Sequence, residues 1–190
     1  MRLAIEEHDQ HSWWVQEYAA AEDLDLLDLW QFPLEGGEEE FPRFLEAHDL
    51  GAVGKETSLV VRALFALRVV IGRTLGWEKS GDLPFEEVHR DAREQTLRIE
   101  NATVVALMHL GWVPVASTPL GRQQDARGEI AGQAREEEAW TAQLAVYARS
   151  KGRLGRVYLQ AISPFRHHLV YPSLVRAVAR RWRSSSHARA

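Results

Sequence analysis

Residues 102–115 have the sequence ATVVALMHLGWVPV, and this stretch decides the fold because its side chains alternate with a period of two. Such alternation predicts a β-strand whose successive side chains point to opposite faces of a sheet. One face would carry Val104, Ala106, Met108, Leu110 and Trp112, and the other Val105, Leu107, His109 and Val113. Because both faces are mostly apolar, we expect a central strand that is covered on both sides or that lines a cavity.

Strands are predicted at four further places, which are residues 12–18, 85–89, 95–100 and 140–149. The first of these is rich in Trp, Val and Tyr, which favour strands, and the last alternates like the central stretch. Residues 24–34 fit either a helix or a strand. Asp25, Asp28 and Gln31 interrupt the apolar residues there at helical spacing, and Pro33 then ends the element.

Helices are predicted in three places, which are residues 38–48, 57–75 and 163–183. Thr57 is suited to cap the second of them, in which apolar residues recur at helical spacing. Ser163 and Pro164 form an N-cap followed by proline at the first helical position, so the last helix is expected to begin there. Pro172 is expected to kink this helix, and residues 184–190 to form a frayed, disordered tail.

The order of these elements predicts one α+β domain over residues 1–183. Strands follow one another in the middle of the chain and a long helix ends it, which is typical of an antiparallel sheet with helices on one face. A chain of 190 residues has the usual length of a single domain. Residues 116–138 are polar and contain three glycines, so they are expected to form a long loop of the kind that is functional or disordered.

Composition excludes several classes of site and partner. The chain has no cysteine, which excludes disulfides, thiolate metal sites and a cysteine nucleophile. It shows no signal peptide and no apolar run of about 18 residues, so we expect a cytoplasmic protein without a transmembrane segment. All 27 acidic residues precede position 139, whereas ten of the 23 basic residues follow it. This asymmetry fits a basic helix packed on an acidic remainder, or a basic face for nucleic acid or a membrane. The pI near 6.1 favours packing, and we expect no nucleic-acid partner.

Five short segments share a pattern with one known family: GRLGRVYL (152–159), ISPFRH (162–167), VRALFALR (61–68), LGW (75–77) and NATV (101–104). They resemble the domain-of-unknown-function family 2867, and the resemblance covers residues 24–182 apart from 116–138, which are longer and more charged than the family pattern. That family resembles the START/polyketide-cyclase-like (SRPBCC) superfamily. The resemblance implies a helix-grip fold, in which a curved antiparallel sheet wraps around the long C-terminal helix and leaves an apolar cavity. It supplies no catalytic residues.

Histidines are the main candidates for a polar site. His109 lies among valines and leucines, where it would be a hydrogen-bonded core residue or a ligand contact if its face lines the cavity. His167, beside His168, would be a proton donor or an anion contact near the start of the last helix, or would pack under the sheet. His8 and His11 have the spacing of a metal pair, but no further ligands lie nearby in sequence. We expect no metal and no cofactor.

The predicted cavity would be lined by six residues, which are Trp77, His109, Trp112, Tyr147, Phe165 and His167. The first functional hypothesis is a binding module that holds a small apolar or amphipathic ligand between the sheet and the terminal helix. The second is an enzyme of the cyclase, dehydratase or hydrolase kind, with His109 or His167 as general base. The third is an interaction protein that binds a membrane surface or a partner through the basic helix, which requires four exposed arginines, Arg176, Arg180, Arg181 and Arg183.

Overall fold

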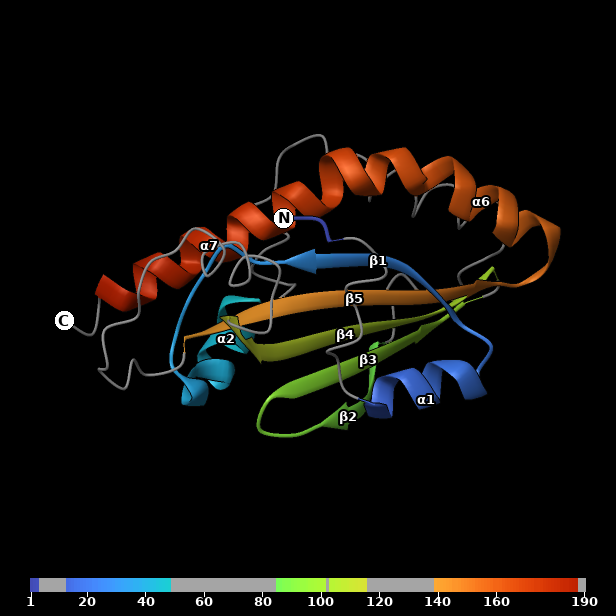
Figure 1. Ribbon diagram of the computed structural model, residues 1–190. Helices are drawn as coiled ribbons and strands as arrows, with labels where there is room; N and C mark the ends of the chain where they lie inside the picture. Colours follow the sequence, from blue (N-terminus) through green and yellow to red (C-terminus); the bar gives the residue numbers. More distant parts are fainter. Residues whose placement is uncertain (4–12, 49–84, 102, 116–138, 188–190) are drawn as a thin grey trace, which may run out of the picture.

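The computed structural model describes residues 1–3, 13–48, 85–101, 103–115 and 139–187. Its centre is an antiparallel sheet of five strands in the order β1-β5-β4-β3-β2 (Figure 1). The strands are β1 Asp25–Gln31, β2 Phe85–Arg90, β3 Glu94–Glu100, β4 Val104–Pro114 and β5 Trp140–Ser150. The α+β class predicted from the sequence is therefore confirmed.

The strand predictions from residue 85 onward are confirmed. The long stretch around residues 102–115 is β4, and it lies between β3 and β5 in the sheet. All eleven residues of β4 pair with β5, from Val104 opposite Ser150 to Pro114 opposite Trp140. The undecided segment at 24–34 contains the edge strand β1, whose pairing with β5 is shifted by a bulge between Leu26 and Asp28.

The predicted strand at 12–18 is wrong, because Trp13–Ala21 form a helix, α1. Val15 and Ala19 are four residues apart and both are buried against the sheet, so they form one side of a helix. Ala19, Ala20 and Ala21 are strong helix formers. Burial of this stripe, together with the alanines, outweighs the strand preference of the tryptophans, valine and tyrosine.

Helices cover both faces of the sheet, which corrects the prediction that they lie on one face only. On one face, Val15 and Ala19 of α1 pack with apolar residues of the strands, which include Leu29, Val105, Leu107, Ala145 and Tyr147. On the other face, Leu110 and Trp112 pack with Phe41 and Phe44 of helix α2 (Phe41–Ala47) and with the C-terminal helix. Figure 1 shows the C-terminal helix and α1 on opposite sides of the sheet. The central strand is thus covered on both sides, as its sequence predicts.

The short helical segment at 38–48 is confirmed. A 3₁₀ turn, Glu38–Glu40, leads directly into α2, and Glu40 Oε2 accepts a hydrogen bond of 2.9 Å from the backbone N–H of Gly37. Trp112 Nε1 donates a hydrogen bond of 3.0 Å to the Gly37 carbonyl, which ties this turn to the central strand.

The C-terminal helix differs from its prediction at both ends. It begins at Gly152 rather than at Ser163, and consists of α6 Gly152–Phe165, a π-helical turn Arg166–Val170, and α7 Tyr171–His187. Gly152 has a φ of 70° where the chain leaves β5, a conformation that glycine adopts without strain. Pro164 lies inside α6, so the expected N-cap pattern does not start the helix.

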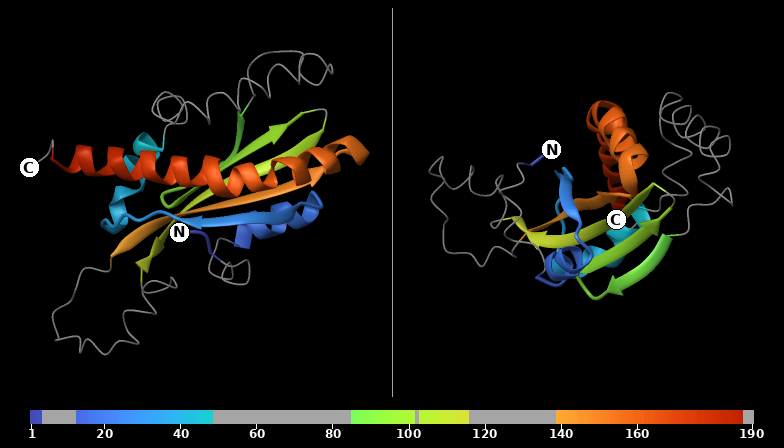
Figure 2. Two further views of the ribbon diagram at one scale, coloured as in Figure 1. Left: turned by 90° about the horizontal axis from the view of Figure 1, so that it is seen from above. Right: turned by 90° about the vertical axis from the view of Figure 1, so that its right-hand side faces the viewer.

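The helix also continues past position 183, so residues 184–187 are helical rather than part of a tail. Pro172 lies within the helix, as expected, and is the second residue of α7 after the π-helical turn. Figure 1 shows the C-terminal helix as an arch rather than a straight rod. Proline lacks a backbone donor and a π-helical turn interrupts the regular ladder, and both are known causes of such bending. Figure 2 (left) shows the helix crossing over the length of the sheet.

Several predictions fall outside the described residues: the helix at 57–75, the loop at 116–138, Trp77 and the His8–His11 pair. In the described part of the chain, no helix is long and apolar enough to span a bilayer.

Candidate functional site

A buried polar cluster joins β1 to the middle of the C-terminal helix. The Asp28 side chain is fully buried, and it pairs with Val146 of β5, whose side chain packs on the face covered by α7. Its Oδ1 is hydrogen-bonded to His167 Nε2, and its Oδ2 lies 3.4 Å from Arg166 Nη2. The two basic side chains come from the π-helical turn, so this irregular turn contributes two neighbouring side chains to the contact with one carboxylate.

Tyr171 completes the cluster at the start of α7. Burial raises the pKa of its hydroxyl well above the usual value, and the charge of Asp28 acts in the same direction, partly opposed by Arg166. The ring packs beside Trp30, with 5.3 Å between ring centroids. An aspartate that bonds one nitrogen of an imidazole fixes the orientation of the ring, as in acid–base sites.

The two halves of the C-terminal helix are packed very differently. In α7, seven residues from Tyr171 to Trp182 are buried: Tyr171, Leu174, Val175, Ala177, Val178, Ala179 and Trp182. In α6, only Gly155 is buried among the described residues. Two further residues on the same side of α6 are half-buried, Tyr158 and Ile162, and so is His167 in the following turn.

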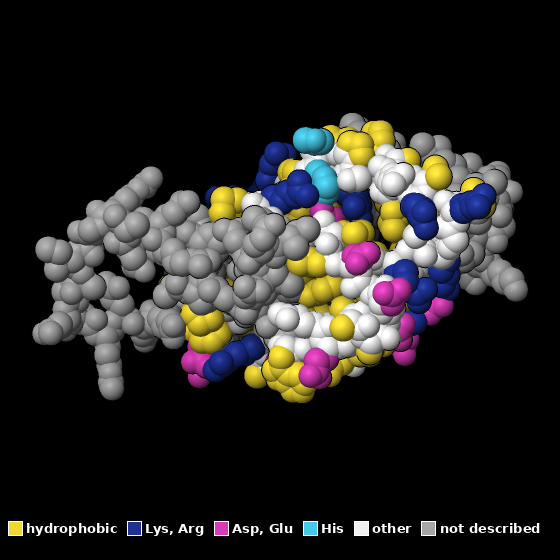
Figure 3. Space-filling model, turned by 45° about the vertical axis from the view of Figure 1, so that its right-hand side comes forward, with side chains coloured by type: hydrophobic (Ala, Val, Ile, Leu, Met, Phe, Trp, Pro, Cys, Tyr) yellow, Lys and Arg dark blue, Asp and Glu magenta, His cyan; other side chains and the backbone are white. Residues whose placement is uncertain are grey.

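The sheet face on the side of the C-terminal helix carries an apolar strip. Leu97 pairs with Met108, and Ile99 with Ala106, so these four side chains share one face with Val146, which pairs with Met108. All five are half-buried, and Met108 and Val146 lie at the margin of the core that α7 covers. Figure 3 shows histidines at the surface where the helix lies over the sheet, and a hollow in the surface beside them. The strip, α6 and the Asp28 cluster together form what we call the helix-side site.

Gly155 attaches the beginning of α6 to the sheet. A β-carbon at this position would lie 2.1 Å from the carbonyl oxygen of Thr103, which is far closer than atoms can approach. Lys151 N–H also donates a hydrogen bond of 2.7 Å to the same carbonyl. The G-x-x-G segment at 152–155 forms the first turn of α6. The helix is therefore held at Gly155 and again at Arg166–Tyr171, with α6 between these two points.

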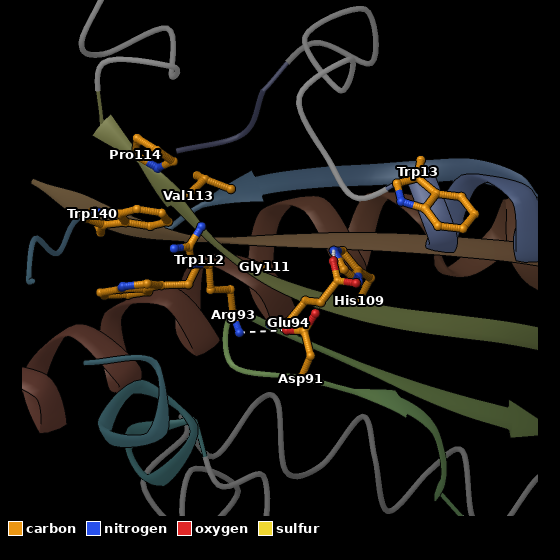
Figure 4. Close-up of a pocket in the computed structure, with 10 residues that line it drawn as sticks. All are labelled: Trp13, Asp91, Arg93, Glu94, His109, Gly111, Trp112, Val113, Pro114 and Trp140. Carbon is orange, nitrogen blue, oxygen red and sulfur yellow. Dashed lines mark hydrogen bonds and ion pairs between the residues drawn. The ribbon is translucent and has the colours of Figure 1, made fainter. Parts of the chain in front are cut away.

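A second polar site lies in the pocket drawn in Figure 4, where His109 belongs to the face covered by α1, while Trp112 and Trp140 belong to the core on the other face. The pocket has a volume of about 380 Å³, and ten residues line it, among them Trp13, Asp91, Glu94, His109 and Trp140. His109 is fully buried, with Nδ1 3.0 Å from Thr96 Oγ1 and Nε2 3.8 Å from Glu94 Oε2. Figure 4 shows the carboxylate of Glu94 beside the His109 ring.

The structure describes five of the six predicted lining residues, and it places them at several different sites. His109 and Trp112 line the pocket of Figure 4, whereas Tyr147 is buried in the core beneath α1. Burial raises the pKa of the Tyr147 hydroxyl. His167 lies at the helix-side site, and Phe165 is 47% exposed. Trp77 lies outside the described residues.

The arginines of the third hypothesis are placed unequally. Arg176, Arg180 and Arg183 are exposed, and their spacing of four and three residues puts them on one side of α7. Arg181 is half-buried and donates a hydrogen bond of 3.3 Å to the Glu46 carbonyl of α2. One of the four expected surface charges is thus used within the domain.

Sequence reasoning missed Asp28, Glu94, His89 and Asp91 as functional candidates. Asp28 contributes to a site only through a contact with His167, 139 residues further on. His89, Asp91 and Glu94, in contrast, lie within six residues at a turn between two predicted strands, and this proximity was a readable signal.

The chain has an α+β fold, in which a long C-terminal helix lies on one face of a five-stranded antiparallel sheet. The chain matches the family described as "Protein of unknown function (DUF2867)" over residues 20–173, and it belongs to that family. No curated protein and no solved structure matched the chain.

Proposed function

We propose that the chain is a START-like, helix-grip domain that binds a small apolar or amphipathic ligand between the sheet and α6. The observation that carries the proposal is the contrast within the C-terminal helix: α7 is packed on the core, whereas α6 buries only Gly155, and the sheet face on the side of α7 carries half-buried apolar side chains. Binding sites of this type have wide apolar walls and few polar groups. The strip from Leu97 to Val146 and the underside of α6 would be those walls.

The Asp28 cluster would supply the polar end of the site. Arg166 and His167 can donate hydrogen bonds, and their side chains are 16% and 18% exposed, so a ligand could reach them. The carboxylate of Asp28 is fully buried behind them and holds both in place. A ligand with an apolar body and an acceptor group, such as a carboxylate, fits this arrangement. From Gly155 to Arg166 the helix rises about 16 Å, which sets the length of the body.

The test is native mass spectrometry of the protein purified from cells. We expect an adduct of a few hundred daltons or less that disappears on denaturation, since drug-sized ligands occupy sites of this kind. Ile162→Glu places a charge on the underside of α6 and should remove the adduct. Ala161→Glu is the matched control, because this neighbouring residue is exposed, and it should keep the adduct. A wild-type spectrum with the bare mass alone contradicts the proposal.

The contact between Asp28 and His167 favours an enzyme as the second candidate. A histidine oriented by a buried aspartate can act as general base toward a molecule bound under α6. The adduct, once identified, would be incubated with wild-type protein and with His167→Gln. The enzyme hypothesis predicts conversion by the wild type alone, while both proteins still bind the molecule. Equal behaviour of the two proteins rejects catalysis and leaves binding intact.

A surface partner for α7 is a separate hypothesis, supported by the exposed arginines at 176, 180 and 183. It predicts co-sedimentation with vesicles that contain anionic lipid, lost at high salt because exposed charges are screened. Unchanged co-sedimentation of a variant with all three arginines replaced by Gln contradicts it.

A further inference from the structure

The hairpin of β2 and β3 gathers three groups that bind metal ions in proteins. His89 Nε2 lies 2.9 Å from Glu94 Oε1 and 3.8 Å from Asp91 Oδ2. One ligand atom from each of the three residues lies within 4.8 Å of the other two. The cluster combines an imidazole nitrogen with two carboxylates, so it is more than a group of acidic side chains.

The turn between the strands determines where Asp91 points. Its Oδ1 accepts hydrogen bonds from the backbone N–H groups of Arg93 and Glu94, at 2.7 and 2.8 Å. These two bonds fix the side chain and leave Oδ2 as the oxygen on the side of His89. A bulge in β2 between Glu87 and His89 accompanies the pairing of His89 with Thr96. The geometry is therefore set by backbone features of the hairpin.

Neighbouring side chains hold the other two groups. Trp14 of α1 stacks on the His89 ring, with centroids 4.2 Å apart and planes 19° from parallel. Glu94 is 13% exposed, and its second oxygen, Oε2, faces His109, which is held in turn by Thr96. Outer residues of this kind orient metal ligands and tune their affinity.

We propose that His89, Asp91 and Glu94 bind a divalent transition-metal ion, with His109 and Thr96 as the outer residues that orient Glu94. With metal–ligand bonds of about 2.0–2.2 Å, neighbouring ligand atoms of a tetrahedral Zn²⁺ site lie about 3.4 Å apart. The observed separations of 2.9 and 3.8 Å lie on either side of that value. The pocket of Figure 4 adjoins Asp91 and Glu94, so the metal would have an open coordination position for water or a small ligand.

The donor set selects the class of ion. A single imidazole with two carboxylates suits Zn²⁺ and similar ions, whereas Mg²⁺ and Ca²⁺ prefer oxygen ligands throughout. The sequence alone led us to expect no metal, because its only conspicuous pair was His8 and His11. The hairpin cluster lies apart from the helix-side site, because His89 stacks on Trp14 of α1, on the other face of the sheet.

The test is calorimetric titration of chelator-treated, tag-free protein with Zn²⁺ alone. Because His8 and His11 can also bind Zn²⁺, the decisive quantity is the difference between variants. Asp91→Asn keeps an oxygen for the two turn hydrogen bonds but loses the anionic ligand. It should weaken one Zn²⁺ site by more than about 100-fold, beyond the 10–100-fold typical of outer residues. His89→Gln should do the same.

His168→Gln is the matched control, since His168 is exposed on the C-terminal helix, and it should bind Zn²⁺ like the wild type. Thr96→Val should weaken the site about 10-fold, and Thr96→Ser, which keeps the hydroxyl, should restore it. Circular dichroism without metal checks that every variant is folded. Identical isotherms for the wild type, Asp91→Asn and His89→Gln overturn the proposal, as does Mg²⁺ binding at this site as tightly as Zn²⁺.

Discussion

Replacing Asp28 with alanine tests whether the helix-side cluster holds the C-terminal helix on the sheet. The carboxylate is fully buried and contacts His167, Arg166 and Tyr171. Removing one partner of a buried ion pair costs about 3–5 kcal/mol, because the remaining charge stays desolvated. Arg166 and His167 are 16% and 18% exposed, so water can solvate them partly. We therefore expect a loss near the lower limit, about 3 kcal/mol of unfolding free energy.

The loss is measured by urea denaturation followed by tryptophan fluorescence, with calorimetry as a second probe. About 3 kcal/mol should lower Tm by about 6–12 °C in a chain of this length. Asp25→Ala is the control, because Asp25 is exposed on the same strand, and it should change stability by less than about 0.5 kcal/mol.

A double variant separates the ion pair from other effects. In Asp28→Ala with Arg166→Met the unpaired cation is gone, so the double variant should be less destabilised than the sum of the two single variants. A loss of less than about 1 kcal/mol in Asp28→Ala, or strict additivity in the double variant, refutes this account of the cluster.

Three further predictions concern stability. Gly155→Ala should lower the unfolding free energy by about 1–3 kcal/mol in urea denaturation, because the added β-carbon meets the Thr103 carbonyl. A gain in unfolding free energy of about 1 kcal/mol, which this substitution gives at an exposed helix position, would contradict the prediction. The unfolding free energy should fall as pH rises above about 10, because tyrosines of the unfolded chain ionise there while burial keeps Tyr171 and Tyr147 protonated in the folded protein. Denaturant melts at rising pH should show a smaller fall in Tyr171→Phe than in the wild type. The same dependence of stability on pH in both proteins would count against this prediction. Phe44→Ala should lower the unfolding free energy by about 3–5 kcal/mol, because Phe44 is fully buried against Phe32 and Trp112. A Tm close to that of the wild type would show that Phe44 is not part of this core.

The central strands could be predicted because their environment imposes one simple pattern. β4 and β5 are covered on both faces, so long apolar runs with a period of two are conspicuous in the sequence. The sequence left the secondary structure of residues 24–34 open because Asp28, an acidic residue, is buried in β1. An acidic residue within a short apolar run produces the same pattern as the polar side of a helix. The strand character of β1 follows from contacts made by distant residues.

The errors at α1 and at the last helix have different causes. In α1 the local strand preference of Trp13, Trp14 and Val15 opposes the packing of a helical stripe, and packing decides. At Ser163 and Pro164 the start pattern is real, but α6 is already formed there. Pro164 lies in the last turn of α6, two residues before the π-helical turn Arg166–Val170.

The candidate sites divide in the same way. The hairpin cluster of His89, Asp91 and Glu94 is local, and two strands joined by a short turn place such residues together. The Asp28–His167 contact is not local, and it depends on the register of β1 and on the path of the helix over the sheet. Long-range contacts of this kind follow from the assembled fold alone.

The claim that α6 covers a ligand site is tested most directly by a two-dimensional amide NMR titration with dodecanoate, whose chain of about twelve carbons suits the 16 Å rise of α6. Saturable shifts should appear at Ala106, Met108 and Ile162, together with Arg166 and His167. A titration that leaves these five amides unmoved, or that perturbs only the pocket drawn in Figure 4, would contradict the claim.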